Sequence, residues 1–118
     1  MQLPKIMNSN ELLFQIEKPL LYQDLINQLN KDFEITGTTI DFLKVKSPSK
    51  LFGFLEDAIS ELVQKDFDIF LNLLYRIDIN EHQIKEIINQ ANENVEKQIT
   101  FLILKREWQK VWLKRNYS

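Results

Sequence analysis

The sequence predicts an all-α fold: a single compact bundle of four to five helices that ends in a long C-terminal helix. Only two glycines and three prolines occur in 118 residues, too few for the many turns of a loop-rich or all-β fold. Apolar side chains recur at three- and four-residue steps along most of the chain, the period of an amphipathic helix. No linker, low-complexity block or internal repeat interrupts the pattern, so we expect one helical domain over residues 1–118.

The first helix is predicted from about Ser9 to Glu17. Asn8 and Glu11 have the spacing of a capping box, in which each residue satisfies an N–H group left unpaired at the helix start. Met7 and Leu12 are placed as the accompanying hydrophobic staple.

A second helix is predicted to begin at Pro19, since proline at the first helical position loses no hydrogen bond. Proline also pushes the residue before it, Lys18, out of helical backbone angles, which separates the two helices. Gly37 suits the left-handed residue that follows a helix end. The apolar residues between them form one stripe at helical spacing: Tyr22, Leu25, Ile26, Leu29 and Phe33.

Residues 38–47 lack a helical period. Ile40 and Phe42 alternate as in a short strand, but a single strand would have no partner in a helical protein. We therefore predict an extended connection that buries Phe42 and Leu43.

Ser47 and Pro48 predict the start of a third helix, as N-cap and first helical residue, and this helix runs to about Gln64. Gly53 within it costs about 1 kcal/mol relative to alanine. We interpret this glycine as a point of close approach by a neighbouring helix or a large aromatic side chain. The apolar stripe of this helix consists of Leu51, Phe52, Leu55, Ile59, Leu62 and Val63.

A fourth helix is predicted to begin at Asp66, where this residue and Asp68 lie favourably against the positive end of the helix dipole. Arg76 and Asp78 flank the end of the helix, and we predict a local ion pair between them that contributes about 0–1 kcal/mol. The residues expected to face inward are Phe67, Phe70, Leu71, Leu74 and Ile77.

A fifth helix is predicted after Asn80, an N-cap whose capping box is completed by Gln83. Ile79 and Ile84 form the staple. This helix either continues to near the end of the chain or breaks near residues 91–94, where asparagines compete for backbone hydrogen bonds. We favour the break, because ordinary globular helices rarely exceed about 25 residues.

On a helical wheel, residues 95–117 are apolar on two nearly opposite faces. One face holds Val95, Ile99, Leu102, Ile103, Leu113 and Tyr117. The other holds Phe101, Leu104, Trp108, Val111 and Trp112. A helix that is apolar on two sides lies at the centre of a bundle or packs against a second chain. The second set is our candidate homodimer interface, because tryptophan is enriched among the residues that dominate binding energy at interfaces.

The same segment is basic. Residues 97–118 hold six Lys and Arg against one Glu, whereas the rest of the chain holds nine against sixteen Asp and Glu. The candidate anion-binding residues are Lys105, Arg106, Lys110, Lys114 and Arg115. They surround the helix, whereas a helix on DNA or on a membrane needs its cations on one side. Pairing with the acidic body, in the same chain or in a dimer partner, therefore competes with nucleic-acid binding.

No pattern predicts catalysis, a metal or a cofactor. The lack of cysteine excludes disulfides, thiol nucleophiles and cysteine metal sites, and favours the cytoplasm. The only histidine, His82, has no metal-binding spacing around it, and Gly37 and Gly53 are too far apart for a phosphate-binding loop. Neither a signal peptide nor a membrane-spanning run is recognisable.

LLYRID at residues 73–78 and KREWQKVW at residues 105–112 together resemble small uncharacterised bacterial proteins of about this length, which are predicted to be helical and have no assigned activity. The resemblance implies a complete chain and assigns no catalytic or ligand residue. We therefore expect a non-enzymatic protein–protein interaction or structural module that self-associates through its C-terminal helix or binds another protein. The alternative is a nucleic-acid-binding accessory protein that uses the basic tail, whose binding would weaken steeply as salt rises.

Overall fold

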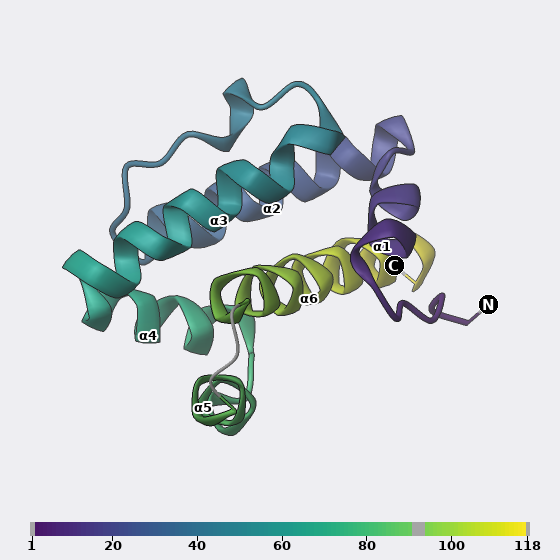
Figure 1. Ribbon diagram of the computed structural model, residues 1–118. Coiled ribbons are helices and arrows are strands. Elements are labelled where there is room, and N and C mark those ends of the chain that lie inside the picture. Colours follow the sequence, from purple (N-terminus) through teal and green to yellow (C-terminus); the bar gives the residue numbers. More distant parts are fainter. Residues whose placement is uncertain (1, 91–93, 118) are drawn as a thin grey trace.

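The computed structural model describes residues 2–90 and 94–117, and over those residues the protein is all-helical, as predicted. The helices form a compact bundle that ends in a long C-terminal helix (Figure 1). The described residues hold six α-helices, one more than the upper number expected. In chain order the elements are α1 (Ser9–Ile16), α2 (Pro19–Ile35), the 3₁₀ turn η1 (Phe42–Lys44), α3 (Pro48–Lys65), α4 (Phe67–Ile77), α5 (Glu81–Asn89) and α6 (Val95–Tyr117).

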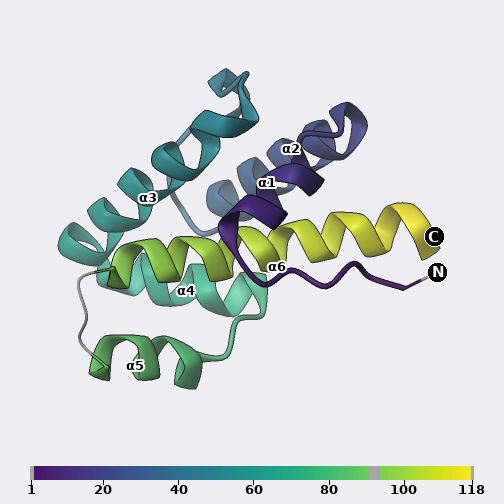
Figure 2. The ribbon, with the colours of Figure 1, turned by 45° about the vertical axis from the view of Figure 1, so that its right-hand side comes forward.

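The C-terminal helix α6 lies at the centre of the bundle (Figures 1 and 2). It contacts α1, α2, α3, α4 and α5. Both of its apolar faces contribute to the core: Ile99 and Ile103 from one face, Leu104 and Trp108 from the other. Of the two arrangements expected for a helix that is apolar on two sides, the protein has the central one.

The start of α1 confirms the predicted cap but not the staple. Asn8 Oδ1 accepts a hydrogen bond from the Glu11 backbone N–H at 2.9 Å. Met7 is exposed, so the predicted staple is wrong, and Ile6 is buried instead. The reason is that the chain before α1 lies against α6, where Lys105 Nζ donates to the Ile6 carbonyl oxygen at 3.0 Å.

The connection after α2 buries Phe42 but leaves Leu43 exposed, so half of that prediction is wrong. Asn30 Oδ1 accepts a hydrogen bond from the Phe42 N–H at 2.8 Å, and Asp41 Oδ1 accepts one from the Leu43 N–H at 2.9 Å. These bonds support the short turn η1, in which successive side chains point in different directions. The Phe42 ring packs edge-on against Phe33, with 4.7 Å between ring centroids.

The two glycines have different roles. Gly37 has φ of 102°, the left-handed conformation predicted after the end of α2. Gly53 is exposed on α3, and a methyl group added there would meet nothing within 4 Å beyond the adjoining residues and backbone of its own helix. The close approach predicted at Gly53 is therefore wrong.

In the second half of the chain, α4 and α5 begin at or next to the predicted residues, but one side chain expected to face inward is exposed. Phe70, Leu74 and Ile77 of α4 are buried, but Phe67 is exposed because it is the first residue of the helix, ahead of the buried stripe. Asn80 caps α5, and its Oδ1 accepts from the His82 N–H at 2.8 Å. The helices α5 and α6 are separate, as favoured, and residues 91–93 of the expected break lie outside the described residues.

Candidate functional site

The candidate interface residues belong to the protein's own core. Leu104 and Trp108 are fully buried, Val111 and Trp112 are nearly so, and Phe101 is half-buried. The four buried side chains pack between α6 and the helices around it, so they do not form a surface that a second chain could contact. The predicted interface is therefore wrong for Leu104, Trp108, Val111 and Trp112, because this part of the second apolar face of α6 is internal.

The candidate anion-binding cations are largely engaged within the chain. Arg106 Nη2 lies 3.4 Å from Asp78 Oδ2, and Arg115 Nη2 lies 2.6 Å from Asp24 Oδ2. Lys105 donates to a backbone carbonyl, as described above. The basic end of the chain thus pairs with the acidic body of the same chain, which is one of the arrangements expected from the charge distribution.

The local ion pair predicted between Arg76 and Asp78 does not form. Arg76 Nε instead donates to Asp32 Oδ1 at 3.0 Å, and Asp78 pairs with Arg106 of α6. Asp78 has φ of 70°, so it turns the chain after α4 in the left-handed conformation. Both partners come from other helices, which spacing along one helix could not reveal.

Two polar stripes meet where α2 packs on α6. Asp24, Gln28 and Asp32 recur every four residues on α2, and Lys110 and Lys114 are four residues apart on α6. Residues four apart lie on the same face of a helix, so each set forms a stripe. We call these five residues the α2–α6 seam.

The inner end of the seam is a buried ionic cluster. Asp32 and Glu107 are fully buried. Asp32 Oδ2 accepts from Lys110 Nζ at 2.9 Å and from Gln28 Nε2 at 3.0 Å, while its Oδ1 accepts from Arg76. Lys110 Nζ also lies 3.2 Å from Glu107 Oε1. The cluster therefore links α2, α4 and α6.

Burial and charge set opposite protonation states for the two acids. Burial, together with the nearby Asp32 carboxylate and against the opposing effect of Lys110, raises the pKa of Glu107 from 4.5 to about 9. Burial alone would also raise the pKa of Asp32, but hydrogen bonds from Glu107, Lys110 and Gln28 outweigh it and hold that pKa below its ordinary value. At neutral pH, Glu107 is therefore protonated and Asp32 is ionised.

The protonated state also accounts for the geometry around Glu107. Neither of its carboxyl oxygens accepts a well-aligned hydrogen bond, even though Lys110 is at ion-pair distance. An ionised, fully buried carboxylate without such bonds would be costly. A protonated carboxyl can instead donate its O–H to Asp32.

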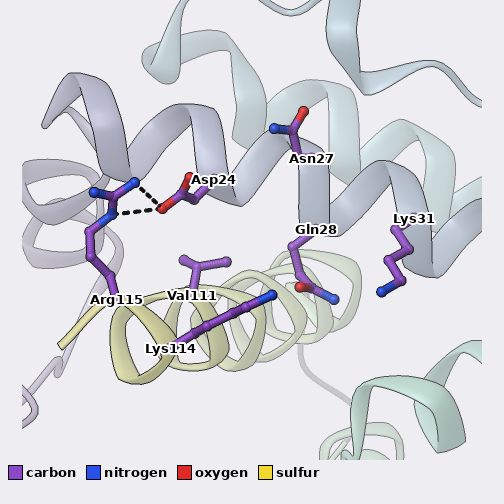
Figure 3. Close-up of a pocket in the computed structure, with 7 residues that line it drawn as sticks. All are labelled: Asp24, Asn27, Gln28, Lys31, Val111, Lys114 and Arg115. Carbon is purple, nitrogen blue, oxygen red and sulfur yellow. Dashed lines mark hydrogen bonds and ion pairs between the residues drawn. The ribbon is translucent and has the colours of Figure 1, made fainter. Parts of the chain in front are cut away.

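The outer end of the seam opens into a recess of about 500 Å³ between α2 and α6 (Figure 3). We call it the α2–α6 recess. Its lining residues are Asp24, Asn27, Gln28, Lys31, Val111, Lys114 and Arg115. Three of them are cations and one is a carboxylate, so the recess is positively charged in a chain whose net charge is −2.

Side chains from both helices converge on the recess. Arg115 is held by Asp24, whose Oδ2 accepts a hydrogen bond from Nε at 2.7 Å and lies 2.6 Å from Nη2. Figure 3 shows Lys31 of α2 and Lys114 of α6 pointing toward Gln28. The side chain of Lys31 has neither an ion pair nor a hydrogen bond with any residue that the structure describes.

The structure gathers only part of the predicted anion-binding set. Lys114 and Arg115 line the recess, whereas Lys105, Arg106 and Lys110 do not. Sequence reasoning missed the α2 half of the site, Asp24 to Lys31, because nothing local connects it with the tail. The regular polar positions on α2 were a signal, but they equally fit an ordinary solvent-facing stripe.

Other kinds of site find no support in residues 2–90 and 94–117. No three acidic or histidine side chains there are grouped to hold a metal ion. His82 is exposed, and its Nε2 lies 3.0 Å from Glu86 Oε1 on the next turn of α5. No helix in the described part of the chain combines the length and apolar character needed to cross a membrane. Comparisons with family models, with curated proteins and with solved structures find no match to this chain.

Proposed function

We propose that the protein is a non-enzymatic binding module that recognises a negatively charged ligand in the α2–α6 recess. One observation carries the proposal: Lys31, Lys114 and Arg115 converge from two helices on a recess in which Asp24 is the one carboxylate among the described lining residues. Opposite charge in a concave site raises the local concentration of an anion and favours its binding.

The size and walls of the recess support this proposal. A volume of about 500 Å³ is within the range of pockets that bind small molecules. Its walls are two helices that the buried cluster around Asp32 holds together, so the cationic side chains project from a rigid base. Such preorganisation lowers the entropy that binding must overcome.

A binding role is better supported than a catalytic one. Glu107, whose pKa is raised, and Asp32, whose pKa is lowered, are absent from the lining of the recess. Their polar atoms face other side chains of the bundle. We therefore propose a structural role for them and a binding role for the cations of the recess.

Self-association and nucleic-acid binding remain predictions with less support. A homodimer would have to use another surface than the buried face around Trp108. A nucleic-acid role for the tail would have to compete with the internal partners of Lys105, Arg106, Lys110 and Arg115. We also propose a cytoplasmic location, supported by the cysteine-free sequence.

The test is to titrate the ¹⁵N-labelled protein separately with inorganic phosphate, citrate and a short DNA duplex, at constant ionic strength. We expect phosphate or citrate to shift amide signals of α2 and α6 around the recess. The variant Lys31→Gln should weaken this binding at least about threefold, because one of three cations is lost. Lys65→Gln removes the same charge from an exposed pair on α3 and should leave the affinity unchanged.

Two results would contradict the proposal. Signal changes that are absent, or scattered over the whole surface, would show that the recess is not an anion site. Changes that only DNA produces, that run along all of α6 and that vanish with salt would favour the nucleic-acid alternative instead.

A further inference from the structure

We infer that Asp24 is a built-in competitor for the anion site, and that a ligand binds by displacing its carboxylate from Arg115. The inference rests on the proposed function and specifies its chemistry. The ligand group would be an oxyanion that presents two oxygens from one atom, a carboxylate or a phosphate.

The geometry of the existing pair leaves Arg115 incompletely used. Its Nε donates to Asp24 Oδ2 at 2.7 Å, and its Nη2 lies 2.6 Å from the same oxygen, so both groups face a single oxygen (Figure 3). The edge of a guanidinium has two parallel N–H groups, which match two oxygens of a carboxylate or phosphate in a bidentate pair. A ligand that supplies both oxygens would therefore bind this edge better than Asp24 does.

Opening the Arg115–Asp24 pair would cost little. The side chains of Arg115 and Asp24 are 44% and 35% exposed, so both can be solvated when they separate. Ion pairs at such exposed positions contribute little to stability. The inner end of the seam, at Asp32 and Lys110, would stay intact because its hydrogen bonds do not involve this pair.

The other two cations of the recess also favour the binding of an added anion. Lys31 and Lys114 face the same recess, and Lys31 has no partner among the described residues. An oxyanion that replaced Asp24 on Arg115 would add negative charge near both lysines. The displaced Asp24 carboxylate would turn toward solvent.

A charge-matched pair of variants tests the competition. Asp24→Asn removes the carboxylate that holds Arg115, and Glu56→Gln removes the one that pairs with Lys97 at 3.2 Å near the other end of α6. Each variant changes the net charge by the same amount. The two pairs are separated by about five turns of α6, roughly 27 Å, and charges are screened over about 8 Å at physiological salt.

Affinities for inorganic phosphate and for citrate would be measured by isothermal titration calorimetry, with sodium chloride holding the ionic strength constant. We expect Asp24→Asn to bind at least about five times more tightly than the wild-type protein, a factor typical of weak coupling between two binding events. Glu56→Gln should stay within about a factor of two. The anion whose affinity rises more in Asp24→Asn identifies the favoured ligand group. Adding Arg115→Gln to Asp24→Asn should abolish the gain in affinity.

Failure of the inference and failure of the proposed function give different results. If wild-type protein binds an anion in the recess but Asp24→Asn and Glu56→Gln bind it equally, Asp24 is not a competitor and the recess is still an anion site. If neither the wild type nor Asp24→Asn binds phosphate or citrate, both proposals are overturned. Thermal unfolding of each variant confirms that the fold is retained.

Discussion

Lys110 of α6 places its ammonium group 2.9 Å from the carboxylate of Asp32 on α2, 78 positions earlier in the chain. Arg76 reaches the same carboxylate from α4. The acids Asp32 and Glu107 are fully buried, whereas Lys110 and Arg76 are partly exposed. The cations thus keep part of their hydration while they fix the positions of three helices.

The protonation of Glu107 predicts how stability depends on pH. Its pKa is about 9 in the folded protein and near 4.5 in the unfolded chain, so between these values the folded state holds a proton that the unfolded state releases. The free energy of unfolding should therefore fall as pH rises from 5 to 8, by about 1 kcal/mol per pH unit. Asp32, whose pKa is lowered, loses its contribution only when the pH falls below this window.

Urea denaturation at several pH values compares the wild type with Glu107→Gln, which keeps a neutral donor in the same place. The slope between pH 5 and 8 should be nearly lost in this variant. Glu61→Gln changes an exposed glutamate and should keep the wild-type slope. Equal slopes in all three proteins would mean that Glu107 is ionised in the folded state.

Trp108 should contribute to stability and not to self-association. It is fully buried, so Trp108→Ala should lower the free energy of unfolding by about 3–5 kcal/mol. Tyr75 is 90% exposed, and Tyr75→Ala should change the free energy of unfolding by less than about 0.5 kcal/mol. Light scattering after size exclusion, at low and high salt, should give the same mass for the wild type and both variants. A wild-type dimer that Trp108→Ala dissociates would restore the interface expected from the sequence.

The two glycines should respond to alanine with opposite signs. Gly53 is exposed within α3 with free space for a methyl group, so Gly53→Ala should stabilise the protein by about 1 kcal/mol. Gly37 has φ of 102°, and Gly37→Ala should destabilise by about 1 kcal/mol or more. Chemical denaturation of both variants tests this pair. A loss of stability in Gly53→Ala would mean that another residue packs against that position.

Local sequence features determined where most helices begin and end. Asn8, Pro19, Gly37, Pro48 and Asn80 act on backbone groups within four residues of themselves, so their effect does not depend on the rest of the fold. The same features also separate α2 from the connection that follows it. Their range is too short to say which way a side chain such as Leu43 or Phe67 points after the helices have packed.

The candidate site could be predicted only in part, for a related reason. The sequence of the C-terminal segment indicated its cations and its two apolar faces, and Lys114 and Arg115 do line the α2–α6 recess. The opposite wall, with Asp24 and Lys31, lies on a helix far away in the sequence. A periodic pattern gives the face of each helix but not its partner.

The sequence by itself therefore determined the all-α class, the caps at Asn8 and Asn80, and the central or shared position of the last helix. Only the tertiary structure decided between those two positions, by enclosing Trp108 within one chain. It also decided that Asp32 binds Lys110 and Arg76, which predicted helix faces alone could not specify. The physical reason is that caps and periodicity arise from interactions within one helix, whereas burial and ion pairing depend on which helices meet.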